Sequence, residues 1–284
     1  MSKRKVVVTG AAGYVAGRIL EDLHEQFDLT LLDVRDTNRA GEKVEGIQIV
    51  DLLNKDRNTY RHHFQGADAV IHFGFVQTSD RSDVDRYFQN ELLNVQMAYN
   101  IYQTAWEGHI RRVVVASSNH AADYYERLFW EGKWDMVDPG DRPLSDNYYG
   151  WAKEVYEHLG FVFATGRVTG RPLENVQIRI GGPRDDDLER AELGDMHRAR
   201  RGMAVYFSAR DMAQLFIKSV ETEDIRDEYG VPFQIFYGIS DNSQRFWSIA
   251  NAREVINYEP QDNSEYEFHE TWIKHIRAMR QGNG

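Results

Sequence analysis

Tyr149 and Lys153 stand one helical turn apart in the segment Tyr149-Gly150-Trp151-Ala152-Lys153. The apolar residues that follow predict a helix starting here, and residues four apart on a helix face the same side. A phenol with a pKa near ~10 is a poor base at neutral pH, but a nearby ammonium favours the phenolate. Such a pair can take a proton from a hydroxyl group. The alternative is an amphipathic helix with a surface lysine and a half-buried tyrosine.

Polar side chains come directly after a strand predicted at residues 113–116, in the order Ser117-Ser118-Asn119-His120. A hydroxyl there can hydrogen-bond the oxygen that the tyrosine deprotonates. Counted from the end of the strand, Ser118 is the better candidate and Ser117 is its neighbour. His120 taken alone fits an ordinary loop histidine.

A glycine-rich turn near the N-terminus is typical of a dinucleotide-binding site. Gly10 permits a tight turn after a buried strand, and Gly13 has no side chain to keep a pyrophosphate off the backbone. A helix from about residue 15 to residue 24 would aim its free N–H groups at that phosphate. The next strand ends in Asp33, whose carboxylate suits the ribose 2′-OH of NAD and repels the 2′-phosphate of NADP. The alternative is a glycine turn in some other βαβ unit.

Strands alternate with helices without hairpin signals, which predicts an α/β fold with a Rossmann-type, doubly wound parallel sheet. We expect a dinucleotide-binding domain over residues 1–174 and a small, mainly substrate-binding region over residues 175–284. Strands are predicted at residues 6–8, 29–32, 47–50, 69–74, 113–116, 176–180 and 233–237, and helices at residues 15–24, 87–106, 149–165 and 211–221. Ligands of such sheets bind outside the carboxyl ends of the strands.

The composition is ordinary for a soluble globular protein, with 42% hydrophobic and 28% charged residues. A net charge of −11 argues against a nucleic-acid partner or an anionic membrane surface. Cysteine is absent, which excludes disulfides, thiolate catalysis and cysteine metal sites. No apolar run is long enough to span a membrane. We expect a cytoplasmic protein without a metal site.

The spacing Thr9-Gly10-x-x-Gly13-x-x-Ala16 resembles the extended short-chain dehydrogenase/reductase family, also called the NAD-dependent epimerase/dehydratase family. Three further segments make the resemblance more specific, to particular enzymes within this family. They are residues 116–120, residues 149–153 and Arg179-Ile180-Gly181. They are similar to uronate dehydrogenases and equally to the haloarchaeal NAD-dependent glucose-6-phosphate dehydrogenases. The resemblance extends over nearly the whole chain.

The resemblance implies a role for each candidate residue. Ser118, Tyr149 and Lys153 would be catalytic. NAD would be bound by Gly10, Ala12, Gly13, Tyr14, Val15, Asp33, Asp51, Leu52, Phe73, Gly74, Tyr149 and Lys153. The sugar would be bound by Gln77, Ser118, Asn119, His120 and Arg201, with Arg198 and Arg200 as less favoured occupants of the arginine's role.

Two of these implied roles have local alternatives. Asp51 and Leu52 would lie against the adenine ring, but an Asp at this position also fits the N-cap of the next helix. Asn94 would support the active-site backbone, although a mid-helix Asn is also a plain surface residue. Helices at residues 87–106 and 149–165 would form a four-helix bundle in a homodimer or larger homo-oligomer.

The implied reaction is NAD-dependent oxidation of C1 of an anionic cyclic aldose, a uronate-type hexose, to the aldonolactone. The alternatives are a sugar-phosphate or sulfo-sugar 1-dehydrogenase, a nucleotide-sugar epimerase or dehydratase, and a redox-sensing scaffold. A guanidinium binds a carboxylate or phosphate through two hydrogen bonds, and six arginines gather within and after the strand at residues 176–180. They are Arg179, Arg184, Arg190, Arg198, Arg200 and Arg201. The alternative is that most of them pair with acids of the same segment, Asp185, Asp186, Asp187, Glu189 and Glu192.

Three departures from the uronate enzymes bear on the substrate. Gly182 and Gln77 stand where serines are expected, and residues 124–147 form a longer, aromatic-rich insert. The length of this insert is closer to the haloarchaeal enzymes. Its aromatic side chains can stack on sugar faces, whereas packing onto the domain is the more frequent use of such residues.

Overall fold

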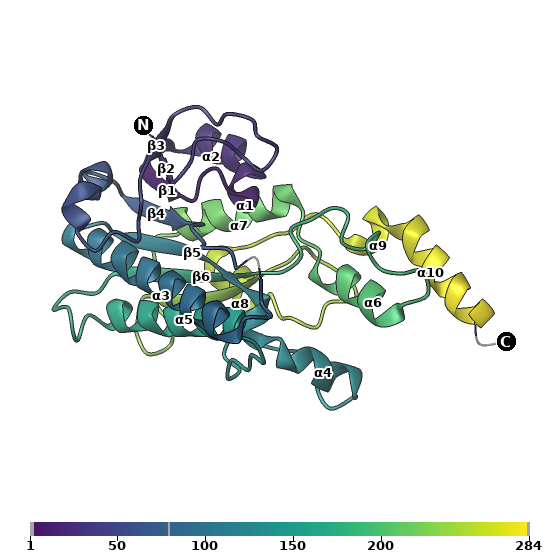
Figure 1. Ribbon diagram of the computed structural model, residues 1–284. Coiled ribbons are helices and arrows are strands. Elements are labelled where there is room, and N and C mark those ends of the chain that lie inside the picture. Colours follow the sequence, from purple (N-terminus) through teal and green to yellow (C-terminus); the bar gives the residue numbers. More distant parts are fainter. Residues whose placement is uncertain (1–2, 79, 283–284) are drawn as a thin grey trace.

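The computed structural model describes residues 3–78 and 80–282. These residues form one sheet in the order β3-β2-β1-β4-β5-β6-β7, and every neighbouring pair of strands is parallel (Figure 1). The strands are β1 (Lys5–Thr9), β2 (Asp28–Asp33), β3 (Ile47–Ile49), β4 (Ala69–His72), β5 (Arg112–Ser118), β6 (Glu174–Ile180) and β7 (Phe233–Gly238). The predicted doubly wound parallel sheet is confirmed.

Helices cover both faces of this sheet, with α3 and α5 on one face and α7 on the other (Figure 1). The α-helices are α1 (Tyr14–Gly17), α2 (Leu20–Gln26), α3 (Val84–Glu107), α4 (Tyr124–Trp130), α5 (Tyr148–Thr165), α6 (Met196–Val205), α7 (Ala209–Glu221), α8 (Ala250–Ile256), α9 (Ser264–Glu267) and α10 (His269–Gly282). Short 3₁₀ turns are η1 (Arg57–Thr59), η2 (Arg61–Phe64) and η3 (Asn119–Ala122).

The alternation of side chains along β1 explains the two cores. Val6 and Val8 are fully buried in a cluster that includes Phe216 of α7. Val7 points to the opposite face and is buried with Ile101 of α3. A strand that is buried on both faces therefore reads as the continuous apolar run that predicted it.

The predicted helix over residues 15–24 is wrong in one respect, because the chain forms two short helices there. α1 ends at Gly17, and α2 begins only after Ile19, whose φ of −128° is not helical. Glycine is a poor helix former, which fits the break at this position. β5 is also longer than predicted, so Ser117 and Ser118 belong to its last residues.

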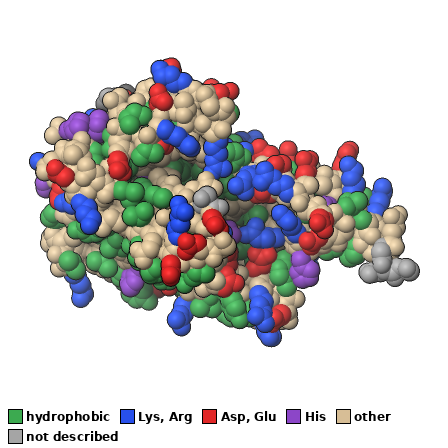
Figure 2. Space-filling model, viewed as in Figure 1, with side chains coloured by type: hydrophobic (Ala, Val, Ile, Leu, Met, Phe, Trp, Pro, Cys, Tyr) green, Lys and Arg blue, Asp and Glu red, His purple; other side chains and the backbone are tan. Residues whose placement is uncertain are grey.

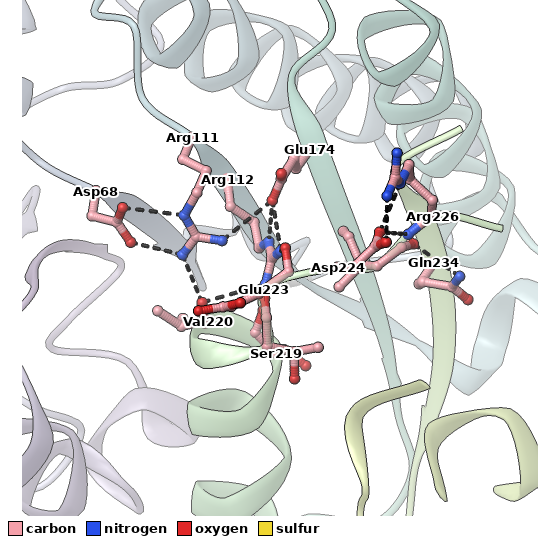
Figure 3. Close-up of polar contacts among 12 residues, drawn as sticks. Asp68, Arg111, Arg112, Glu174, Ser219, Val220, Glu223, Asp224, Arg226 and Gln234 are labelled. Carbon is pink, nitrogen blue, oxygen red and sulfur yellow. Dashed lines mark hydrogen bonds and ion pairs between the residues drawn. The ribbon is translucent and has the colours of Figure 1, made fainter. Parts of the chain in front are cut away.

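Arg111 and Arg112, at the start of β5, link the sheet to the C-terminal end of α7 through hydrogen bonds (Figure 3). Arg112 is fully buried and donates to the carbonyls of Ser219 (2.8 Å) and Thr222 (2.6 Å), which lie at the C-terminal end of that helix. A cation is favourable there because the last carbonyls of a helix carry partial negative charge. Glu174 of β6 accepts from both Arg111 and Arg112, at 3.2 and 2.8 Å.

The C-terminal part of the chain contributes strands to the sheet and also forms a helical extension beyond it. β6 and β7 complete the sheet, so the sheet continues beyond residue 174, and the domain boundary stays a prediction. α6, α9 and α10 lie together beyond one end of the sheet (Figure 1). Their own small core contains Leu188, Ala191, Ala199 and Met203, with Phe268 and Trp272 packed against it. No helix within the described residues has the length and apolar character needed to cross a bilayer.

Candidate active site

Tyr149 and Lys153 lie near the start of α5, where the side chain of Asn147 accepts from the backbone N–H of Gly150 at 2.9 Å. Lys153 is only 4% exposed, and its Nζ donates to the carbonyl of Ala116 at 2.8 Å. The same nitrogen lies 5.5 Å from the centre of the Tyr149 ring. The helical spacing thus brings the phenol and the ammonium together at the carboxyl end of β5.

The two serines of β5 have different neighbours. The Ser117 hydroxyl donates to the buried carboxylate of Glu157 at 2.6 Å, so this hydroxyl is directed into the protein interior. Ser118 is 5% exposed, and a hydrogen bond from its side chain acts to lower the pKa of Tyr149. Of the two, Ser118 is therefore the one placed beside the phenol.

Burial governs the charge state of this pair in the protein alone. It raises the pKa of the Tyr149 phenol to about 12, because a phenolate loses hydration there. It lowers the pKa of Lys153 to about 7 for the same reason, although the carboxylates of Glu91 and Glu157 act in the opposite direction. The tyrosine is therefore protonated at neutral pH, and further positive charge is needed to make it a base.

The loop after β4 forms one wall beside these side chains. Asn94 of α3 is 4% exposed; it accepts from the backbone N–H of Val76 (2.7 Å) and donates to the Val76 carbonyl (3.1 Å). Phe75, one residue earlier, places its ring edge-on to Tyr149 with 5.3 Å between the ring centres. Asn94 thus holds the backbone of this loop, the supporting position implied from the sequence. Gln77 is exposed in the same loop.

The glycine turn lies against the end of β4. Gly10 has a φ of +71°, and a Cβ at this position would come within 2.5 Å of the backbone nitrogen of Gly74. A Cβ at Gly13 would come within 2.9 Å of the Gly10 carbonyl oxygen. The backbone N–H of Ala12 donates to the carboxylate of Asp33 at 3.0 Å. The turn formed by Gly10, Ala12 and Gly13 therefore packs tightly against Asp33 and the backbone of Gly74, and a side chain at either glycine would collide with the protein itself.

Other predicted cofactor residues flank this turn. The Tyr14 hydroxyl donates to the Pro183 carbonyl at 3.4 Å. Val15 packs against the core under the turn. The Phe73 ring lies 4.9 Å from that of Phe216.

Asp51 and Leu52 have local structural roles. The Asp51 carboxylate accepts from the backbone N–H of Leu53 at 2.9 Å in a local turn. It is not the helix N-cap weighed as the alternative, because Asp56 caps the next helical turn, η1. Leu52 is 5% exposed and belongs to the core on the α3 side of the sheet. Their contact with an adenine ring stays a prediction.

A pocket of about 710 Å³ opens beside His120. It is lined by His120, Asp123, Glu126, Arg127, Trp130, Glu131, Asp146, His197 and Arg201. The His120 ring lies 5.4 Å from that of Tyr149 and bonds the carboxylate of Asp123. The structure thus joins two residues predicted to bind substrate, His120 and Arg201, in one pocket next to the phenol.

Arg201 is held by one edge only. Its Nε donates to Glu126 at 2.9 Å, while its two terminal nitrogens form no hydrogen bond within the described residues. Glu126 also accepts from the indole of Trp130 at 3.4 Å. This arrangement fixes the guanidinium plane and leaves its end available to an acid group. The sequence did not single out Glu126, because its partner lies 75 residues away.

Arg179 is not available to a ligand, contrary to its inclusion among the anion-binding candidates. It is 1% exposed, pairs with Glu157 at 2.9 Å and donates to the Tyr237 hydroxyl at 3.0 Å. Two other arginines of the segment pair with nearby acids, Arg184 with Asp187 (3.7 Å) and Arg190 with Asp186 (2.8 Å). Figure 2 shows basic and acidic side chains side by side between the body of the molecule and its C-terminal extension.

The long insert packs mainly onto the domain. The ring of Phe129 stacks on Phe246 at 4.5 Å, and Tyr125 lies 5.0 Å from Trp134. Trp130 alone among its tryptophans and phenylalanines lines the pocket beside His120. Asn119 is 2% exposed, and its Nδ2 has no partner among the described residues.

The chain is similar to known sugar dehydrogenases. It is 28% identical to the uronate dehydrogenase of Pseudomonas syringae pv. tomato, over 92% of this chain and 83% of the relative. It is also 28% identical to the NAD-dependent glucose-6-phosphate dehydrogenase of Haloferax volcanii, over 91% of this chain and 94% of the relative. The solved structure of a glucuronic acid dehydrogenase from Chromohalobacter salexigens matches with a TM-score of 0.73 and 27% identity, covering 94% of this chain and 88% of that one.

These likenesses confirm the resemblance predicted from the motifs, and with it the expectation of an enzyme of the dehydrogenase class. The family model described as "NAD(P)H-binding" matches residues 10–223, from the first glycine of the turn to the end of α7 and just beyond. The chain belongs to this NAD(P)H-binding family.

Proposed function

We propose that this protein oxidises C1 of a cyclic aldose with NAD, giving the aldonolactone, NADH and a proton. Tyr149 takes the proton of the anomeric hydroxyl, and Ser118 hydrogen-bonds the same oxygen. The observation that carries the proposal is the joint placement of Ser118, Tyr149 and Lys153 beside a pocket that contains His120 and Arg201. A binding module or scaffold has no need of this arrangement.

NAD is the cofactor that fits the glycine turn. Gly10 and Gly13 permit the tight turn that precedes α1, as in a pyrophosphate-binding turn, and Asp33 ends the neighbouring strand beside them. When bound, the nicotinamide ring accepts the hydride from C1 and brings positive charge close to the phenol. That charge and the Lys153 ammonium together oppose the effect of burial on the pKa of Tyr149.

The substrate is an anionic hexose, a uronate first and a sugar phosphate second. Arg201 presents the free end of its guanidinium in the pocket, and a planar guanidinium binds a carboxylate through two parallel hydrogen bonds. Four acids line the pocket. Asp123 pairs with His120, Glu131 with Arg127 and Lys133, and Glu126 with Arg201 itself, whereas Asp146 has no cationic partner among the described residues. An incoming acid group would therefore bind through the two terminal nitrogens of Arg201, which the Glu126 pair leaves free within the described residues.

The test is NADH production measured with glucuronate, galacturonate, glucose 6-phosphate, a sulfonated hexose and neutral aldoses. We expect the highest kcat/KM with a uronate. Best activity on a neutral aldose, unchanged in Arg201→Ala, would reject the anionic substrate. A nucleotide-sugar epimerase would regenerate its NAD and give no net NADH, so absorbance at the NADH band separates these two classes.

A further inference from the structure

One face of α3 is directed at the reacting side chains. Tyr87, Glu91 and Asn94 are spaced at i, i+4 and i+7 and therefore share a side of the helix. The Tyr87 hydroxyl accepts from the backbone N–H of Tyr149 at 3.0 Å. Asn94 holds both backbone groups of Val76 in the loop beside the phenol. Glu91 thus sits between two residues that each fix part of the active site.

Glu91 is an unusual occupant of this position because it is 1% exposed. Its Oε2 accepts from Asn94 at 3.0 Å, and its Oε1 is buried without a hydrogen-bond partner among the described residues. A buried carboxylate with an unused oxygen is costly unless a positive charge lies near it. Burial accordingly raises the pKa of Glu91.

Lys153 is the buried cation on the opposite helix. Its Nζ lies 5.4 Å from the ring of Phe75, the residue next to the Val76 backbone that Asn94 holds. Of the carboxylates that raise the pKa of Lys153, Glu91 acts more strongly than Glu157. Arg81 also faces this pair and lowers the pKa of Glu91, and Lys153 lowers the pKa of His72. Tyr156, whose ring centre lies 4.8 Å from the Lys153 nitrogen, and Tyr149 face it as well, and the Glu91 carboxylate by itself raises the pKa of both phenols.

We propose that Glu91 is a positioning residue for the oxidation: its buried carboxylate, fixed by Asn94 at the junction of α3 and α5, keeps the Lys153 side chain as an ammonium beneath Tyr149. The inference rests on the proposed function. Burial alone favours a neutral amine at Lys153, and a neutral amine cannot help to stabilise the Tyr149 phenolate. The carboxylate of Glu91 opposes that loss of charge without touching substrate or cofactor.

The test replaces the carboxylate by an amide of the same shape. Glu91→Gln keeps an oxygen for Asn94 but removes the negative charge. We expect the pKa of Lys153, followed by NMR of ¹⁵N-lysine-labelled protein and assigned with Lys153→Arg, to fall by about one unit or more. The alkaline fall of kcat/KM for NADH production should move to lower pH by a similar amount, because Lys153 then loses its proton at a lower pH. Glu91→Asp, which keeps the charge, should largely restore both values.

Asp85→Asn is the matched control, since it removes an exposed carboxylate from the first turn of the same helix. It should leave the Lys153 titration unchanged. An unchanged Lys153 titration in folded Glu91→Gln overturns the inference, while the absence of NADH from every sugar with the unmodified protein overturns the proposed function instead. If Glu91→Gln does not fold, ¹³C-carboxyl labelling of the unmodified protein decides. A Glu91 carboxyl that stays protonated at pH 7 cannot hold an ammonium, and an ionised one supports the inference.

Discussion

Burial and the carboxylates of Glu91 and Asp123 raise the pKa of the Tyr149 phenol, whereas the Ser118 hydrogen bond and Arg81 lower it. Replacing Tyr149 by Phe removes the proposed base and should lower kcat by at least ~10²-fold while NAD binding stays nearly unchanged. For the unmodified enzyme we expect kcat/KM to rise with pH as the phenol loses its proton, because only the deprotonated form accepts the proton, and to fall at alkaline pH where Lys153 loses its ammonium. Turnover followed by NADH absorbance and NAD affinity by calorimetry check both points. Tyr148→Phe, which changes the exposed neighbour, is the control; near-normal turnover in Tyr149→Phe would remove the residue from this role.

Asp33 should determine the choice between the two nicotinamide cofactors. Asp33→Ala removes the carboxylate that repels a 2′-phosphate, so kcat/KM with NADP should rise relative to NAD. The variant also loses the bond from the Ala12 N–H, which should weaken binding of both cofactors. Asp36→Ala also removes one negative charge close to this site. It should leave the ratio of kcat/KM with NADP to kcat/KM with NAD unchanged. An unmodified enzyme that uses NADP as efficiently as NAD would contradict this assignment.

Arg201 should distinguish anionic from neutral sugars. Arg201→Ala removes charge-assisted hydrogen bonds worth about 1.5–3 kcal/mol, so kcat/KM for a uronate should fall roughly 10- to 100-fold. Neutral aldoses should be affected little. Arg198→Ala and Arg200→Ala are matched controls in the same helix, and both arginines are exposed. A larger loss of uronate activity in either control would transfer the role to that arginine.

The turn between β1 and α1 is an element that tolerates no added side chain at Gly10. Gly10→Ala combines a left-handed backbone with a contact of 2.5 Å to the Gly74 nitrogen, and should lower the free energy of unfolding by about 2–4 kcal/mol. Gly17→Ala, where a Cβ meets nothing within 4 Å, should be neutral or slightly stabilising. Chemical denaturation of the two variants without ligand provides the comparison. Equal stabilities would show that the turn relaxes more easily than its geometry indicates.

Elements with a strong local signal were predictable, and pairings over long sequence separations were not. The buried strands follow from apolar runs such as residues 113–116, and the helix with Tyr149 and Lys153 follows from its spacing. The break after Gly17 was missed because one glycine does not decide where a helix ends. Nothing local indicates that Arg179 pairs with Glu157, or that Glu126 meets Arg201. Such choices depend on which helices the sheet brings together.

For the whole molecule, the resemblance predicts a dimer through α3 and α5. Four large apolar side chains of α3 are exposed: Val84 (56%), Leu92 (37%), Leu93 (40%) and Tyr99 (39%). We expect light scattering to give twice the 33.0 kDa of one chain, and Leu93→Glu to give a folded monomer. Val168→Glu, at an exposed apolar residue outside both helices, should leave the dimer intact. A monomeric unmodified protein would contradict the prediction.

The fastening of β5 to α7 has a consequence for biosynthesis. Arg112 binds a carbonyl 107 residues further along the chain, so the arginine leaves the ribosome long before its partner exists. Until that partner emerges, the guanidinium lacks these acceptors, and burying it when β5 pairs with β4 and β6 is costly. A nascent chain halted at residue 174 therefore holds both the glycine turn and the Tyr149 helix without a finished sheet to carry them. We therefore expect the sheet to be completed only after α7 has been synthesised.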